Sequence, residues 1–245
     1  MKTTNYLFTL LALSVLILSS VTVFAESQDE AATLGEYVFD ISGCASCHTK
    51  DQPLAGGVEL VTPFGNFFSP NISPDTQYGI GGWTNDQFIK AMREGISPDG
   101  EHYYPAFPYT SYVNMTTRDL LHLKAYLDAQ TPVSEITFPH ELGFPFNQRA
   151  LLGVWKLINI TENWAPDPNR SETWNRGSYL ANGPSHCSQC HAPRNFIGGL
   201  KGSGGMVGNE QGPDEENVPP LLDVSKLGFG SWSEEDIIFA LEVGM

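Results

Sequence analysis

The chain carries the pattern Cys-x-x-Cys-His twice, as CASCH and as CSQCH. Together the two copies contain all 4 cysteines of the 245-residue chain. Covalent haem attachment uses this pattern because two thiols three positions apart add to the two vinyl groups of one porphyrin. The adjacent histidine then lies where its imidazole can coordinate the iron. The sequence therefore predicts two haem c groups. The predicted attachment residues are Cys44, Cys47, Cys187 and Cys190, and the predicted iron ligands are His48 and His191.

Cysteine pairs with this spacing also occur in other chemistries. Each pair could form a redox-active dithiol, or the two pairs together could bind one zinc ion with four thiolates. Neither chemistry requires a histidine directly after the second cysteine. Two histidines in that position favour haem over both alternatives.

The first residues of the chain have the layout of a secretory signal peptide. Lys2 is followed by an apolar run from Leu7 to Leu18 and then by small residues up to Ala25. The run is shorter than the roughly 20 residues that span a bilayer, which favours cleavage over an uncleaved membrane anchor. We therefore predict that residues 1–25 are removed and that the mature protein is exported to the periplasm. It would then meet a membrane only through a partner.

The composition is acidic and rich in loop-forming residues. The formal net charge is −15, from 28 acidic and 13 basic side chains, which disfavours binding to nucleic acid or to anionic lipid. It suits a partner with a basic docking face. The 24 glycines and 17 prolines indicate short helices joined by long loops. We expect an all-α, loop-rich fold.

The sequence around the two haem patterns forms an internal repeat. A tryptophan follows each pattern, then an acid-bearing helix start (TNDQ, SEED) and an apolar helix face. The matched positions are Gly35 with Gly177, Tyr37 with Tyr179, Asn71 with Asn217, and Trp83 with Trp232. The repeat predicts two domains of one fold.

Four regions follow from this repeat. The signal peptide (1–25) precedes domain one (26–132), a connection rich in proline and aromatic residues (133–171) and domain two (172–245). In domain one we predict a helix over Asn85–Glu94 that ends at Gly95, and a closing helix from about Thr117 to Ala129. Thr116 or Thr117 is the expected N-cap of that closing helix.

Several stretches of the chain resemble a known family. GIGGWTNDQFIKAMREGISPDG, YYPAFPYTSY, WNRGSYLANGPSHCSQCHAPRN and GSWSEEDIIFALEVG are similar to the multihaem cytochrome c subunits of bacterial membrane-bound alcohol and gluconate dehydrogenase complexes. The resemblance covers nearly all of the mature chain. It implies tandem class I cytochrome c domains that pass electrons from a dehydrogenase subunit towards quinone or a terminal oxidase, without catalysis by this chain.

The resemblance also suggests the sixth ligand of the first haem iron. Met115 lies in the loop before the closing helix, where a cytochrome c domain carries its methionine ligand, and we predict it as the partner of His48. Met92 and His102 are the alternatives, and Met92 is expected to pack in the core. Some relatives carry a methionine where this chain has Phe107.

Domain two ends soon after its tryptophan-bearing helix. Gly244 is followed by Met245, and no ligand loop or closing helix follows within the sequence. We therefore expect domain two to be C-terminally incomplete, with the sixth ligand of its haem iron beyond Met245. The three-haem dehydrogenase subunits that the chain resembles would place a third haem domain after it. The main functional alternative is a dihaem peroxidase, in which one iron keeps an open position for peroxide.

Overall fold

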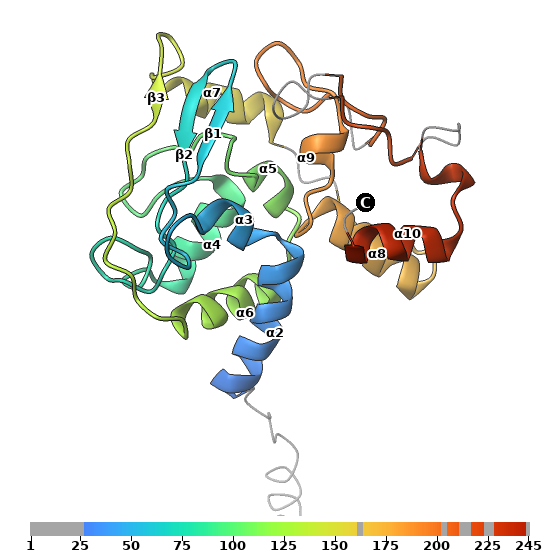
Figure 1. The fold of residues 1–245 in the computed structure, drawn as a ribbon, viewed down its shortest axis with the longest axis horizontal. Helices are drawn as coiled ribbons and strands as arrows, with labels where there is room; N and C mark the ends of the chain where they lie inside the picture. The colour runs from blue at the N-terminus through green and yellow to red at the C-terminus, as the bar shows by residue number, and fades with distance from the viewer. Residues whose placement is uncertain (1–26, 161–163, 202–204, 211–216, 223–227, 244–245) are drawn as a thin grey trace, which may run out of the picture.

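The computed structural model describes residues 27–160, 164–201, 205–210, 217–222 and 228–243. The described chain is rich in short helices, with one small sheet and long loops between the elements (Figure 1). Its elements, in order, are α2 (Gln28–Ile41), α3 (Cys44–His48), β1 (Glu59–Thr62), β2 (Gly65–Phe68), α4 (Asn85–Glu94), α5 (Tyr109–Tyr112), α6 (Thr117–Asp128), β3 (Glu141–Leu142), α7 (Leu151–Asn159), α8 (Glu172–Asn182), α9 (Ser188–His191), η2 (Phe229–Ser231) and α10 (Glu234–Val243).

The first part of the chain is organised by the crossing of α2 and α6 (Figure 1). A Cβ atom at Gly35 of α2 would overlap the backbone carbonyl of His122 in α6, so only glycine permits this close approach. Val38 of α2 packs in the core with Leu120 and Leu123 of α6, and all three side chains are almost fully buried. The crossing of α2 and α6 therefore forms one side of the hydrophobic core, and Cys44 of the first haem pattern packs against this core.

The predicted ends of two helices are confirmed. Thr84 caps α4, because its side chain accepts a hydrogen bond from the backbone N–H of Gln87 while the Gln87 side chain accepts from the backbone N–H of Thr84. At the other end Gly95 adopts the left-handed conformation, with φ of 59°. Thr116 caps α6 by accepting from the backbone N–H of Asp119. These caps explain why both helices begin where the sequence places them.

The prediction of an all-α fold was wrong in one respect, because a three-stranded antiparallel sheet follows α3. Strands β1 and β2 form a hairpin in which Glu59 pairs with Phe68 and Thr62 pairs with Gly65. Strand β3 adds to β2 through the pairing of Gly65 with Leu142. The β-branched and aromatic residues of the hairpin suit a pleated surface, and the third strand comes from a segment far along the chain. The helix-rich, loop-rich character of the fold is nevertheless as predicted.

The connecting segment, 133–171, contains helix α7 and two packed tryptophans. Trp155 donates a hydrogen bond from Nε1 to the carbonyl of Ile197 at 2.8 Å and packs edge-on against Tyr109 at 6.4 Å. Trp164 donates to Ser178 Oγ at 3.2 Å. The connection is thus anchored to both parts of the chain that carry a haem pattern.

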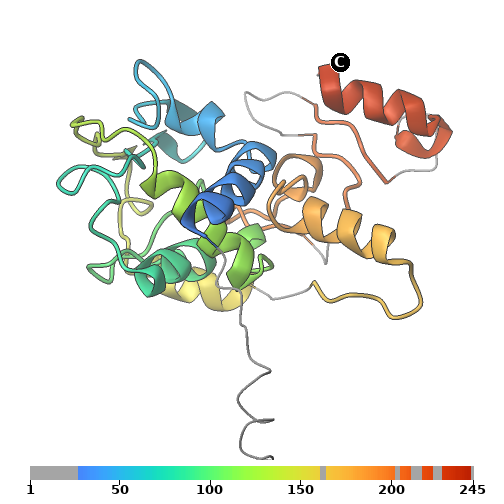
Figure 2. The ribbon, with the colours of Figure 1, turned by 90° about the horizontal axis from the view of Figure 1, so that it is seen from below.

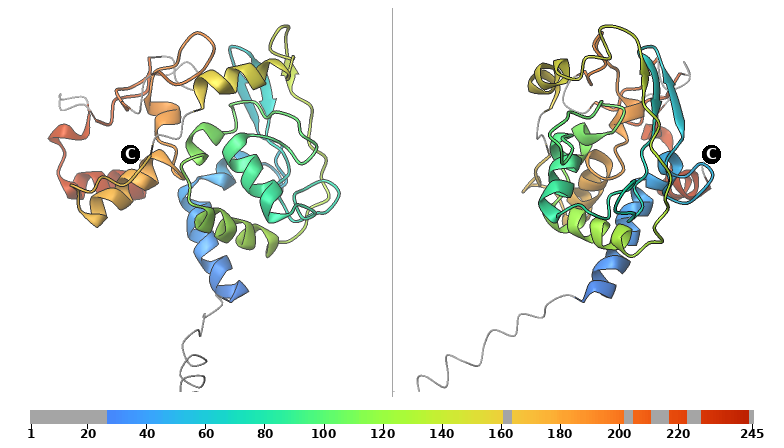
Figure 3. Two further views of the ribbon diagram at one scale, coloured as in Figure 1. Left: turned by 180° about the vertical axis from the view of Figure 1, so that it is seen from behind. Right: turned by 90° about the vertical axis from the view of Figure 1, so that its left-hand side faces the viewer.

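Helices α8, α9 and α10 belong to the later part of the chain. Tyr179 of α8 is buried and donates to the Asp119 carboxylate at 2.6 Å, which attaches α8 to the start of α6. Helix α10 stands apart from α8 in Figure 2 and has no buried side chain among its described residues. In the left view of Figure 3, seen from behind, α8 and α10 lie to one side of α2 and α6.

The predicted signal peptide and the last two residues, Gly244 and Met245, lie outside the described residues. Within the described ranges, no helix combines the length and the apolar character needed to cross a bilayer.

Candidate haem-attachment site

The first Cys-x-x-Cys-His pattern forms the short helix α3. Gly43, just before it, is left-handed with φ of 59°, which turns the chain sharply out of α2. Cys44 and Cys47 are three positions apart in α3 and so share one face of the helix. Both cysteines and His48 line a large cavity.

The ring of His48 is oriented by a hydrogen bond to the backbone. Nδ1 lies 2.8 Å from the carbonyl oxygen of Pro70. A carbonyl can only accept, so Nδ1 carries the proton and Nε2 keeps its lone pair. Burial lowers the pKa of His48 below its usual value, although the bond to Pro70 acts in the opposite direction. The neutral ring with a free Nε2 is the form that an iron ligand requires.

The cavity has a volume of about 2330 Å³. A single small-molecule site usually measures roughly 300–1,000 Å³, so this space exceeds the needs of one bound group. Its walls are mostly apolar and aromatic, with Trp83, Phe107 and Tyr112 among them. Cys190 of the second pattern lines the same cavity. The cavity is therefore wide enough, apolar enough and correctly placed to hold a porphyrin at the first pattern and to extend to the second.

The second pattern repeats the geometry of the first. His191 Nδ1 lies 2.8 Å from the carbonyl oxygen of Pro219, as His48 does from Pro70. The backbone carbonyls match as well, because Gly56 N–H donates to His48 and Gly208 N–H donates to His191, each at 2.8 Å. The two segments thus present their histidines in the same way.

This match corrects the sequence alignment of the repeat. Since Pro70 and Pro219 play the same part, Asn71 corresponds to Pro220 and not to Asn217. In the first copy the Asn71 side chain donates to the carbonyls of Val133 and Glu135, at 2.7 and 3.0 Å. Loops of different length in the two copies shifted the sequence match by three positions.

The state of the thiols distinguishes haem attachment from the alternatives. All four cysteines are free thiols. Burial raises the pKa of Cys44 to about 12 and also raises the pKa values of Cys187 and Cys190. Redox-active dithiols need a lowered pKa, so these surroundings do not favour dithiol chemistry. In the part of the chain that the structure describes, no three histidine, cysteine or acidic residues converge to hold a metal ion, which leaves zinc without a ligand set there.

The methionines fall into different surroundings. Met115, the predicted sixth ligand, is 1% exposed in the core and lies beside Gly183, and it is not among the residues that line the cavity. Met92, the alternative, lines the cavity from α4. Met206 is buried and its carbonyl accepts from Leu221 N–H, in the way that Leu54 accepts from Ile72. His102 lies by α7, in a different pocket.

Sequence reasoning missed two contributors to the site. Pro70 and Pro219 act through their backbone carbonyls, which no side-chain pattern reveals. Arg194 also supports the second pattern, because it donates to the carbonyls of Gly198 and Gln189, both at 2.8 Å, and so holds the loop around α9.

Known proteins match most of the chain, although no protein-family model does. A diheme cytochrome c-type protein of Cereibacter sphaeroides is 41% identical over 220 residues, which cover 87% of this chain and 73% of that protein. The fructose dehydrogenase cytochrome subunit of Gluconobacter japonicus is 37% identical, over 90% of this chain and 46% of that protein. The alcohol dehydrogenase (quinone) cytochrome c subunit of Gluconobacter oxydans is 36% identical, over 95% of this chain and 51% of that protein. The chain thus spans about half the length of the dehydrogenase cytochrome subunits that it matches.

The names of these relatives agree with the haem-attachment chemistry that the two patterns indicate. The cytochrome c subunit of a gluconate 2-dehydrogenase is also similar, at 32% identity. A cytochrome c holds its haem covalently, and two free thiols followed by a histidine, as in both patterns, are the groups that such attachment needs. The chain belongs to the family of c-type cytochromes that includes dihaem cytochromes c and the cytochrome c subunits of dehydrogenases.

Proposed function

We propose that this protein is a periplasmic dihaem c-type cytochrome that carries single electrons from a dehydrogenase partner towards the respiratory chain. The observation that supports this most strongly is the repeated site. Two cysteine pairs each precede a histidine whose Nδ1 is bound to a proline carbonyl at 2.8 Å. The first pattern lines an apolar cavity that Cys190 of the second pattern also reaches.

The residues that would hold the two groups are those of the two patterns. Cys44 and Cys47 would form thioethers to one haem, with His48 on its iron, and the second pattern would do the same through Cys187, Cys190 and His191. When bound, haem supplies an iron that gains and loses one electron without leaving the protein. The bond from each histidine to its proline fixes the ring, and the aromatic walls keep water from the iron.

The sixth ligand in the first site stays a prediction with two candidates. Met115 has the sequence position expected from the resemblance, whereas Met92 is the methionine that lines the cavity. A thioether ligand raises the reduction potential and suits a carrier. The position of Met92 is the observation that favours it over Met115.

We further propose that 26–132 and 172–245 are two copies of one cytochrome c unit joined by 133–171. The matching hydrogen bonds around His48 and His191 support this. The names of the fructose, alcohol and gluconate dehydrogenase subunits support a dehydrogenase as electron donor. A quinone-linked enzyme or a terminal oxidase is the proposed acceptor. The charge of −15 favours a basic docking face on either partner.

The haem content tests this proposal directly. The mature protein, produced with the cytochrome c maturation machinery, should retain two haems through acid–acetone extraction, as measured by intact mass and the pyridine haemochrome spectrum. Replacing Cys44 and Cys47 together with alanine should leave one haem, and the matched pair Cys187→Ala with Cys190→Ala should also leave one. A chain without covalent haem would contradict the proposal, and efficient peroxide turnover by the holoprotein would contradict the carrier role.

A further inference from the structure

His186 has a backbone conformation that its residue type disfavours. Its φ is 39°, in the left-handed region, and it directly precedes the first cysteine of the second pattern. The corresponding residue of the first pattern is Gly43, with φ of 59°. Glycine adopts this region readily, whereas a residue with a Cβ atom is strained there. The second copy therefore places a histidine where the fold favours glycine.

The side chain of His186 reaches the first haem pattern. Its Nε2 lies 3.1 Å from the carbonyl oxygen of Ser42, so Nε2–H donates to the turn just before Cys44. The ring also packs edge-on against Tyr112, with the centroids 5.7 Å apart. Tyr112 is buried and close to both thiols of the first pattern, Cys44 and Cys47. The imidazole thus spans the space between the two attachment segments.

A second contact beside His186 supports the same arrangement. Gln189, between the two cysteines of the second pattern, donates to the hydroxyls of Thr110 and Ser111, at 2.9 and 2.8 Å. Both hydroxyls belong to α5 of the first unit. The second attachment segment is therefore held on the first unit at two points, by His186 and by Gln189, and the contact of His186 is the one that touches the turn leading to Cys44.

We propose that His186 is a positioning residue that fixes the two haem-attachment segments against each other. This proposal rests on the proposed function, because it concerns the two haems of one chain. The interaction between two charges falls with their separation, so a fixed spacing sets how far the reduction of one haem shifts the potential of the other. The cost of the left-handed histidine is offset by the contact that it makes with Ser42.

The decisive variant is His186→Gly, studied in the full mature holoprotein. Glycine restores the favoured residue at this φ and removes only the imidazole, so the protein should fold and keep both haems. A redox titration followed by visible absorption measures how far the reduction of one haem shifts the reduction potential of the other. In the variant this shift should be several-fold smaller than in the wild-type protein. Amide hydrogen exchange in α9 should become faster. His186→Asn, which tolerates the left-handed region but is too short to reach Ser42, should behave in the same way.

Two further variants complete the test. Gln189→Ala removes the neighbouring contact and should lower the mutual shift less than His186→Gly does. Gln52→Ala removes an exposed hydrogen bond between the first unit and Glu135 of the connecting segment, and should leave the shift unchanged. A His186→Gly protein with two haems and an unchanged mutual shift would overturn this inference alone. A wild-type chain without covalent haem would overturn the proposed function as well.

Discussion

The helices that follow the two haem patterns, α4 and α10, match in sequence and differ in their support. Helix α4 buries Phe88, Ala91 and Met92, whereas no described side chain of α10 is buried. The helices that precede the two haem patterns, α2 and α8, each carry a matched glycine, Gly35 and Gly177, and the packing around these glycines also differs. The backbone of α6 lies directly against Gly35, whereas no atom of the described residues outside its own helix lies within 4 Å of the place where a Cβ of Gly177 would be.

The attachment geometry, in contrast, is the same in both copies. His48 and His191 make equal hydrogen bonds to proline carbonyls, although the closely packed core among the described residues lies around the first copy. The comparison shows that the two copies keep the same hydrogen bonds at the attachment histidine although the packing of their described residues differs. Packing around it contributes stability to the first copy, while the second copy is held on the first through α8 and α9.

The largest expected difference between the copies is at the two matched glycines. Gly35→Ala should lower the free energy of unfolding by more than about 3 kcal/mol, because the new Cβ meets backbone that cannot rotate away. Gly177→Ala should be neutral or stabilise by up to about 1 kcal/mol, since alanine favours helix and open space surrounds the site. Urea denaturation of both holoproteins measures this, and equal losses at the two positions would show that the copies are packed alike.

A second pair of variants compares the apolar faces. Leu120 is fully buried in α6, so Leu120→Ala should cost about 3 kcal/mol through lost burial and a residual cavity. Leu241 of α10 is 75% exposed, and Leu241→Ala should change stability by no more than about 0.5 kcal/mol. Thermal unfolding of the two holoproteins checks the difference. A large loss at Leu241 would mean that α10 is covered in solution.

Local features of the first unit were predictable from sequence. Thr84 and Thr116 cap helices that begin where the pattern of apolar residues begins, and Gly95 ends α4. The sheet was missed because β1 and β2 have only four residues each, and because β3 comes from a distant segment and adds to β2 by only two residue pairs. Contacts of this kind depend on how the chain returns on itself, which residue patterns do not encode locally.

The site was predictable to a similar degree. The cysteines and histidines of both patterns follow from their spacing, and the structure gives the two histidines matching hydrogen bonds. The partners Pro70 and Pro219 lie 22 and 28 positions away from their histidines and act through backbone oxygens. The contact of His186 with Ser42 spans 144 positions, so only the folded chain reveals it.

The methionine candidates allow a third comparison, with a smaller effect on stability. Met92→Leu gives α4 the residue that α10 has at the matched position, Leu241. Because the two side chains have similar volumes, the free energy of unfolding should fall by less than about 1.5 kcal/mol. If Met92 is the sixth ligand, as its place in the cavity favours, the potential of the first haem should fall and its sulfur-to-iron absorption band in the near-infrared should disappear. Met115→Leu is the matched control. Loss of the band in Met115→Leu alone would restore the ligand predicted from the sequence.

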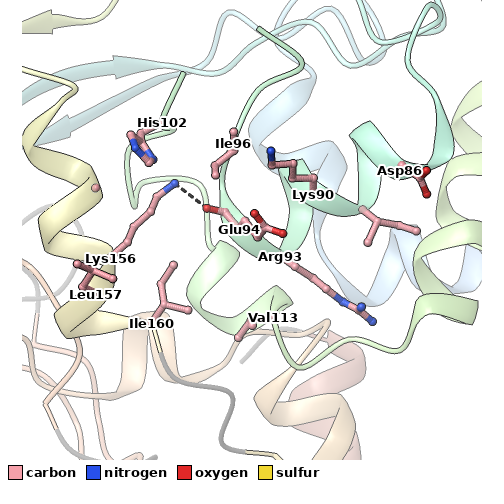
Figure 4. A pocket seen from close by; sticks show the side chains of 12 residues that line it. Asp86, Lys90, Arg93, Glu94, Ile96, His102, Val113, Lys156, Leu157 and Ile160 are labelled. Atoms are coloured by element: carbon pink, nitrogen blue, oxygen red, sulfur yellow. Dashed lines mark hydrogen bonds between the residues drawn. The ribbon is translucent and has the colours of Figure 1, made fainter. Parts of the chain in front are cut away.

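The smallest expected effect concerns the C-terminal end of α4, where a lysine side chain from another helix binds the last carbonyls. Lys156 of α7 donates from Nζ to the carbonyls of Glu94 and Gly95, at 2.6 and 2.5 Å, and so satisfies the last turn of α4 (Figure 4). The last turn of α10 has no basic residue, and no described side chain of that helix is buried. Burial lowers the pKa of Lys156 from its usual 10.5 to about 8, while the nearby Glu94 carboxylate acts in the opposite direction.

This lowered pKa predicts how stability depends on pH. Between pH 8 and 10.5 the unfolded chain binds a proton at Lys156 that the folded chain has largely released, so the free energy of unfolding should rise with pH in this window. Among the neighbours, burial lowers the pKa of His102 below 6.5, so His102 titrates below this window. Burial raises the pKa of Tyr109 from its usual 10.0, so Tyr109 lowers the free energy of unfolding only as the pH passes 10, at the top of the window. Lys156→Met should remove the rise, whereas Lys90→Met, at an exposed position of α4, should retain it. Urea midpoints measured from pH 7 to 10 test this, and parallel curves for the wild-type and Lys156→Met proteins would show that Lys156 keeps its proton on folding.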